Sequence, residues 1–259
     1  MHDRWDFTFA EPDARLRGYV HRYCAYEEHT VSFTRRRELP SDRVVGIVNL
    51  GPPIWINGEE VRDGFFGGLS DTYAVSETRG AQRGVQIDFS PLGAHLLLRV
   101  PLHELAGEIV PLDTLLGTRL HDRLANATDP FAVLDALFLG RLDDALSPVP
   151  SVTRALARLR ATEGRVGVNE LADELGCSRR YLTAHFREQV GVPPKLFARI
   201  LRFQNAVSLI DLEPSWATIA QRAGYYDQAH LIRDFQQFAG DAPGAFAARR
   251  LPDGGGVRD

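Results

Sequence analysis

The stretch LADELGCSRRYLTAHFREQVGVPPKLF, residues 171–197, is followed by a second stretch of the same design, IAQRAGYYDQAHLIRDFQQFAGDAPGAF, residues 219–246. In both, an alanine precedes a glycine by four residues. A leucine, a phenylalanine, a glycine, a proline and a phenylalanine then follow at steps of four, five, three and three. Only the step from the first glycine to the leucine differs, six in one copy and seven in the other. Eight positions in nearly fixed register indicate an internal repeat.

The repeated unit has the pattern of a helix-turn-helix. In the first copy, a short helix is expected over Asn169–Leu175, and Gly176 suits the left-handed backbone of a tight turn. Ser178 is the expected N-cap of the next helix, which buries Leu182 and Phe186 one turn apart. The outer face of that helix stays free for a DNA major groove.

The second copy repeats this pattern, and a longer helix joins the two. The units are expected at 169–188 and 216–237, with Asp227 as the second N-cap. Between them, Pro193-Pro194 opens a helix predicted over Lys195–Ile210. At 1.5 Å per residue it forms a strut of roughly 24 Å. The predicted architecture of this half is all-α.

The stretch from Gly224 to Gly240 resembles the second-helix signature of the AraC/XylS family of bacterial transcription regulators, and Leu171–Phe186 resembles the family's first unit. The similarity covers about residues 151–250. It implies a sequence-specific regulator that binds double-stranded DNA, with two recognition helices in successive major grooves on one face of the duplex.

Carried over by position, the resemblance implies two sets of reading residues. They are Arg180, Thr183 and Ala184 on the first helix, and Gln228, Ala229, His230 and Arg233 on the second. Arg179 and Arg187 are expected on phosphates. Two positions depart from the family: Ala184 stands where arginine is frequent, and Ala229 where a polar residue is common. Alanine makes no hydrogen bond to a base, although its methyl can touch a thymine methyl.

Each of these residues also has a purely structural interpretation. Arg180 and Arg233 taken alone would be ordinary solvated helix arginines, and His230 could be a polar residue at the edge of the fold. The repeat favours the DNA-binding interpretation for the arginines. The net charge permits it: residues 151–259 carry +3, whereas residues 1–150 carry −7 and the whole chain −4.

The domain boundary is expected at the prolines of Ser147–Ser151, because two prolines prevent a continuous helix. Residues 1–147 form the expected effector-sensing or dimerisation domain, 148–150 the linker and 151–259 the DNA-binding domain. Ser151 is the expected N-cap of a helix that buries Val152, Leu156 and Leu159.

The first half changes from strand to helix patterns along its length. Asn57-Gly58 after Ile54–Ile56 predicts a two-residue hairpin. Other short strands are expected at 43–50, 65–66, 73–75 and 85–89. Helical periods follow at 94–100, 102–109, 112–116 and 131–146. The fold class is therefore α+β: a small N-terminal β barrel or sandwich with trailing helices, then the all-α domain.

The N-terminal half resembles a recurrent uncharacterised domain associated with AraC-type regulators, on 37–43, 49–52 and 88–94. Regulators of this family commonly carry a ligand-sensing or dimerising domain there. The candidate lining of an effector pocket is Trp55, Phe66, Tyr73 and Phe89, although aromatic residues in such strands more often belong to the core. Expected partners are a small-molecule effector, RNA polymerase and a second copy of the chain, joined through Phe131–Leu146. The alternative is a ligand-independent regulator whose N-terminal half only dimerises.

Enzyme classes find little support in the sequence. The histidines show no H-x-H or H-E-x-x-H spacing, and there is no G-x-S-x-G or phosphate loop. Cys24 and Cys177 are too few for a disulfide framework or a thiolate zinc site. We expect no metal, no cofactor, no membrane span and a cytoplasmic location. The rival classes are a metal-dependent small-barrel enzyme fused to a DNA reader, and a helical scaffold that binds protein.

Overall fold

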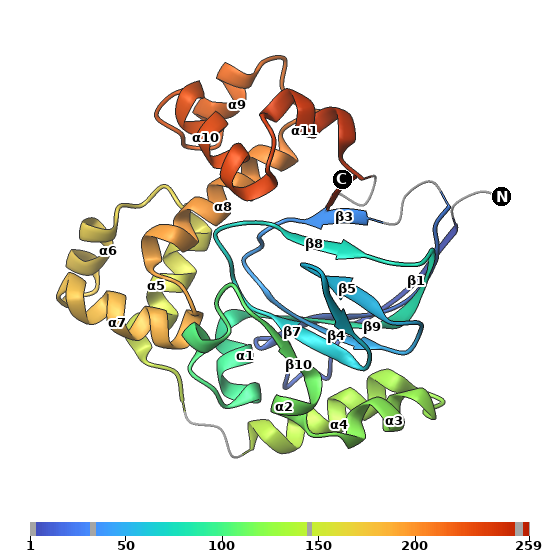
Figure 1. Cartoon of the computed structure of the whole chain (residues 1–259). Coiled ribbons are helices and arrows are strands. Elements are labelled where there is room, and N and C mark those ends of the chain that lie inside the picture. The colour runs from blue at the N-terminus through green and yellow to red at the C-terminus, as the bar shows by residue number, and fades with distance from the viewer. Residues whose placement is uncertain (1–3, 32–34, 144–146, 252–255, 259) are drawn as a thin grey trace.

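The N-terminal half of the computed structural model is a sandwich of two antiparallel sheets, and the structure describes residues 4–31, 35–143, 147–251 and 256–258 (Figure 1). The larger sheet has the order β1 (Arg4–Ala10), β2 (Val20–His29), β9 (Ala81–Phe89), β4 (Val44–Asn49), β7 (Gly64–Gly67) and β10 (Ile109–Pro111). The smaller has the order β11 (Gly256–Arg258), β3 (Arg35–Glu38), β8 (Ala74–Glu77), β5 (Ile54–Ile56) and β6 (Glu59–Val61). In the described residues the sheets are separate, so the predicted sandwich is confirmed and the barrel is not closed.

The hairpin predicted at Asn57-Gly58 is confirmed. Strands β5 and β6 pair on either side of it, with Ile56 opposite Glu59. Asn57 and Gly58 both have positive φ, 52° and 87°. A two-residue turn with this backbone matches the right-handed twist of the strands, and asparagine followed by glycine adopts it most easily.

Helices cover the outer face of the larger sheet. They are α1 (Pro91–Leu98), the 3₁₀ turn η1 (Leu102–Glu104), α2 (Leu112–Leu116), α3 (Arg119–Ala125) and α4 (Pro130–Leu142). The Phe138 ring of α4 meets Phe89 edge-on at 5.2 Å, and Tyr23 donates a hydrogen bond of 2.9 Å to Asp135. The apolar stripe of α4 therefore packs on its own sheet. Residues 144–146 of the helix predicted at 131–146 lie outside the described residues.

The helix expected over 102–109 is wrong. After the single turn η1, Gly107 adopts a φ of +74°, and Ile109–Pro111 pairs with β7 as strand β10. The helical spacing of leucines was misleading because Gly107 interrupts the segment with a backbone conformation that no helix contains. Strand pairing at the sheet edge then satisfies the backbone groups that a helix would have used.

The C-terminal half contains seven described helices. They are α5 (Pro150–Ala161), α6 (Val168–Glu174), α7 (Arg179–Val190), α8 (Pro194–Ser208), α9 (Trp216–Arg222), α10 (Gln228–Ala239) and α11 (Pro243–Arg249). Of these, α6 to α10 are those expected from the repeat and the segment that joins its copies, α5 is the one expected after the proline boundary, and α11 was not predicted. The predicted cap at Ser151 is wrong: Val149 precedes the helix and Pro150 occupies its first turn. Proline is favoured there because its missing N–H would have no partner in the helix.

The described residues contain a small hydrophobic cluster around Ile54 and Ile56 in the sandwich and two larger cores, and the two larger cores do not coincide with the two halves of the chain. The main core runs without interruption from Leu16 in the sandwich to Phe197 and Ala198 in α8, so it includes the first helix-turn-helix unit. A second core belongs to the second unit and contains Ile200 and Phe203 of α8. Helix α8 is thus shared by both cores, and Figure 1 shows it crossing from the first unit to the second.

The sequence predicts an all-α C-terminal half, but the described residues of this half also contain one short strand. Residues Gly256–Arg258 form strand β11, which pairs with β3 at the edge of the smaller sheet (Figure 1). A three-residue strand at the end of a chain has too little pattern to be predicted, because its pairing depends on a sheet built more than 200 residues earlier. Within the described residues, no helix is long and apolar enough to cross a membrane.

Candidate DNA-binding surface

The first unit is formed by α6, a turn and α7. Gly176 takes a φ of +65° in the turn, and the Ser178 hydroxyl accepts a hydrogen bond of 3.1 Å from the Tyr181 N–H. Leu182 and Phe186 are fully buried. The predicted cap, turn and inward face are therefore confirmed, and the opposite face of α7 is directed to solvent.

The second unit, α9 and α10, is built in the same way. Gly224 has a φ of +81°, and the Asp227 carboxylate caps α10 by accepting a hydrogen bond of 2.7 Å from the His230 N–H. Leu231 and Phe235 are fully buried, as expected. The equal architecture of the two units follows from the repeat, because the same capping and packing positions recur in each.

The residues expected to read DNA on α7 lie on its solvent face. Arg179, Arg180, Ala184 and Arg187 are exposed, and Thr183 is half-buried. A side chain that reads a base edge must reach away from the protein, and these positions meet that requirement. Whether they touch bases stays a prediction.

The residues expected on α10 behave similarly, with one exception. Gln228, Ala229 and Arg233 are exposed, whereas His230 is half-buried. The His230 ring meets Tyr225 edge-on at 5.1 Å. This contact favours the alternative that His230 is a polar residue at the edge of the fold, because part of its ring is already used in packing.

Ion pairing separates the arginines of this half into two groups. Between residues 147 and 251, eight arginines bond a carboxylate or a carbonyl outside their own helix: Arg158, Arg160, Arg165, Arg199, Arg202, Arg222, Arg249 and Arg250. In this described range, five have no such partner: Arg154, Arg179, Arg180, Arg187 and Arg233. Four of these five stand at the positions predicted for DNA contact. An uncommitted guanidinium can bind phosphate or guanine without breaking an internal bond.

Two exposed residues of this half, one of them in the turn before α10, were missed by sequence reasoning. Tyr226 is 94% exposed in the turn before α10, although its neighbour Tyr225 is buried. Arg154 is exposed on α5. A tyrosine hydroxyl and an arginine both suit phosphate contacts. The Tyr-Tyr pair was a usable signal, because only one of two adjacent residues can face the core of a short turn.

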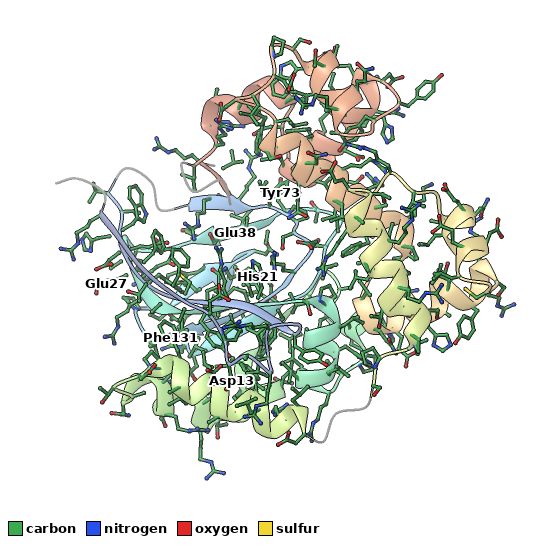
Figure 2. All side chains as sticks on the ribbon, turned by 180° about the vertical axis from the view of Figure 1, so that it is seen from behind. Asp13, His21, Glu27, Glu38, Tyr73 and Phe131 are labelled. Atoms are coloured by element: carbon green, nitrogen blue, oxygen red, sulfur yellow. The ribbon has the colours of Figure 1, made fainter. Side chains whose placement is uncertain are left out.

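The four aromatic residues proposed for an effector pocket are not gathered at one place. Phe66 and Phe89 are buried together, 6.2 Å apart between ring centroids, in the main core. Trp55 lies on β5 beneath Arg79, and Tyr73 lies beside the second unit, where Figure 2 labels it. A ligand pocket at these residues stays a prediction.

A different cleft, of about 270 Å³, lies between the sandwich and α5. Its lining includes Arg17, His21, Asp42, Arg43 and Arg160, so cations outnumber the one carboxylate. Arg160 of α5 pairs with Asp42 at 2.8 Å, which makes this ion pair a bridge between the two halves. Burial, assisted by the Arg43 charge, lowers the pKa of His21. Burial also lowers the pKa of Arg43 itself, although the charges of Asp42 and Asp88 act in the opposite direction.

Comparisons with known proteins agree with this architecture. Residues 171–249 match the family described as a helix-turn-helix domain, and residues 8–111 match a domain of unknown function, DUF6597. Among solved structures, ToxT from Vibrio cholerae is similar over 95% of this chain and 98% of its own, with 11% identity and a TM-score of 0.50. The C-terminal domain of AraT, a response regulator from Geobacillus stearothermophilus, is similar over 42% of this chain and 93% of its own, with 21% identity and a TM-score of 0.38. No curated protein matches the chain.

The repeat, its two capped turns and these matches lead to one conclusion. The C-terminal half of the chain contains a helix-turn-helix domain of the AraC type, its N-terminal half contains a domain of unknown function, and the whole chain has a two-part fold similar to that of ToxT.

Proposed function

We propose that this regulator reads two successive major grooves of one DNA site with α7 and α10. The observation that carries the proposal is the set of uncommitted arginines. Arg179, Arg180 and Arg187 on α7, and Arg233 on α10, are exposed without an ion pair among the described residues, while most neighbouring arginines are engaged. Arg180 and Arg233 serve as base readers, and the other two contact phosphates. Ala184 and Ala229 offer only methyl contacts.

The expected footprint on DNA is asymmetric. Two helices about one duplex turn apart, roughly 34 Å or 10 bp, protect about 16–20 bp. Protection is stronger and more sequence-dependent on the half read by Gln228 and Arg233, because Ala184 on α7 cannot hydrogen-bond a base. Footprinting of the full chain on genomic fragments selected by binding measures this. The full chain is needed, because the first unit shares its core with the sandwich.

Two outcomes would contradict this account. Equal dependence on base sequence in both halves of the site would show that Ala184 does not weaken base reading by α7. Protection of a single groove would show that only one unit docks. A complete lack of mobility shift on these fragments would favour a partner other than DNA, and a shift that failed to weaken with salt would show that the arginines contribute few phosphate contacts, because phosphate contacts release counterions.

The effector is proposed to be a small anion, a carboxylate or a phosphate, in the cleft between the sandwich and α5. Three arginines line the cleft, Arg17, Arg43 and Arg160, whereas Asp42 is the one carboxylate among its lining residues. An anion there also competes with Asp42 for Arg160, and so acts on the bridge between the halves. Binding at this cleft would change how the first unit is held.

Small anions are therefore expected to raise the melting temperature of the wild-type chain. At an anion concentration 100 times the dissociation constant, the stabilisation is about 2.7 kcal/mol. Thermal unfolding with acetate or with inorganic phosphate, at constant ionic strength, distinguishes the two chemistries. Arg17→Gln should abolish the response with little loss of stability, because Arg17 is exposed and has no ion pair in the described residues.

The matched control is Arg165→Gln, which removes an equal charge from an exposed pair with Glu163 outside the cleft. An unchanged anion response in Arg17→Gln would refute the site.

The division into a sensing domain at 1–147, a linker at 148–150 and a DNA-binding domain at 151–259 is likewise our proposal. So are homodimerisation through the N-terminal half, contact with RNA polymerase and the absence of catalysis.

A further inference from the structure

The second unit is attached to the smaller sheet at one place, which we call the sheet junction: Arg37, Tyr73, Ala239, Asp241 and strand β11. The Arg37 side chain, 8% exposed, donates a hydrogen bond of 2.6 Å to the Ala239 carbonyl and lies 3.0 Å from the Asp241 carboxylate. Ala239 is the last residue of α10. Arg37 thus places a cation at the negative end of the second recognition helix.

The approach at the sheet junction is close. Gly240, with a φ of +76°, follows α10 directly, and a Cβ there would lie 2.6 Å from Arg37 Nη1 and 2.7 Å from Tyr73 Cε1. The Arg37 guanidinium also lies 5.2 Å from the centre of the Tyr73 ring. Figure 2 labels Tyr73 where the sandwich meets the second unit. Glycine is required both for the backbone and for this contact.

Strand β11 joins the same two bodies by a second route. Its backbone pairs with β3, so that Val257 lies opposite Arg37. The Val257 side chain is fully buried in the core of the second unit, together with Phe246. The strand belongs to the sheet through its hydrogen bonds and to the second unit through its side chain.

The sheet junction leaves the reading face open. Its hydrogen bond to α10 is at the C-terminal end of that helix, while Gln228, Ala229 and Arg233 remain exposed. The first unit is held separately, because α7 shares the main core with the sandwich. Helix α8, roughly 22 Å long at 1.5 Å per residue, is therefore not the only connection between the recognition helices.

We propose that Arg37 is a positioning residue: it holds α10 at a fixed angle and distance from α7 and so sets which spacing of two half-sites the protein accepts. This inference rests on the proposed two-groove reading. Without the Arg37 contacts, α10 is still tied by α8, by β11 and by the 3.3 Å hydrogen bond from Gln237 to Asp71, but the C-terminal end of α10 loses its direct bond to the sheet and small rotations become possible. Half-site spacing in such proteins is a direct consequence of the geometry between reading helices.

The test is selection of bound duplexes from a random-sequence library about four helical turns long. Wild-type protein should enrich two motifs at one spacing. Arg37→Met should enrich the same two motifs at several spacings that differ by about one or two base pairs. Its preference for the best spacing over the next best should fall about tenfold. A recognition helix that is one base pair out of register loses about as much binding free energy as one mismatched base pair costs, and a mobile α10 avoids this loss. Affinity for either motif alone should not change.

Arg22→Met is the matched control, because Arg22 pairs with Asp88 at 2.8 Å inside the larger sheet, away from both units. It should keep the single spacing. Hydrogen exchange tests whether the second unit of Arg37→Met is folded. If it is unfolded, the same selection is repeated with Asp241→Asn, because this substitution weakens the same ion pair with almost no change in side-chain shape. A single spacing in the folded variant would overturn the positioning role. Wild-type enrichment of only one motif would instead refute two-groove reading, and the spacing role with it.

Discussion

Replacing Phe235 by alanine is expected to lower the stability of the second helix-turn-helix unit by about 3–5 kcal/mol. Phe235 is fully buried, and its ring meets Phe203, Trp216 and Phe246 at centroid distances of 5.0, 6.1 and 5.3 Å. Alanine leaves a cavity that three aromatic rings cannot fill without moving. This loss is a large part of the stability of an ordinary domain.

Hydrogen exchange is the right measurement, because it reports the second core separately from the main one. Protection of amides in α10 should fall with Phe235→Ala, while amides of β9 should keep theirs. Leu212→Ala is the control: Leu212 is 71% exposed in the same region, so its truncation should change stability by no more than about 0.5 kcal/mol. A loss below about 1 kcal/mol for Phe235→Ala would mean that the core relaxes around the cavity.

Replacing Arg233 by alanine is expected to weaken binding to the selected operator by about 1–3 kcal/mol and to leave binding to random DNA nearly unchanged. Arg233 lies on α10 between the buried Leu231 and Phe235, and is itself exposed. In the described residues its one bond is from Nε to the Ala229 carbonyl of its own helix, 3.3 Å long. The guanidinium can therefore turn to a guanine at little cost.

Arg154→Ala is the control for charge alone, since Arg154 is exposed without a described partner but lies on α5, outside both recognition helices. It should weaken specific and random DNA equally, if at all. Mobility shifts at several salt concentrations measure both quantities. Equal losses on operator and random DNA for Arg233→Ala would identify it as a phosphate contact.

Local pattern was enough to predict the helix-turn-helix units. Caps at Ser178 and Asp227, turns at Gly176 and Gly224, and inward phenylalanines were all predicted from residues within one turn of each other, and the structure confirms them. The Asn57-Gly58 hairpin was predicted for the same reason. These features depend on neighbours in the chain, and the sequence contains all of those neighbours.

Features that join distant segments were not predicted. The helix expected at 102–109 became strand β10, because a free edge of β7 was available to it. The four aromatics expected in one pocket separated into core and surface contacts, since their strands lie at different places in the sandwich. The cleft that contains Arg160 and Asp42 forms only when α5 packs on the sandwich.

The sequence by itself determined the unit, its duplication and the face of each recognition helix, because helix periodicity and capping are settled over a few residues. The tertiary structure decided how the two units are held. It placed the first in the main core, gave the second a core of its own and joined that core to the sheet through Arg37 and β11. Arg37 and Asp241 are 204 positions apart. Only tertiary packing brings such residues together, so the buried ion pair that they form cannot be predicted from the residues next to either of them in the sequence.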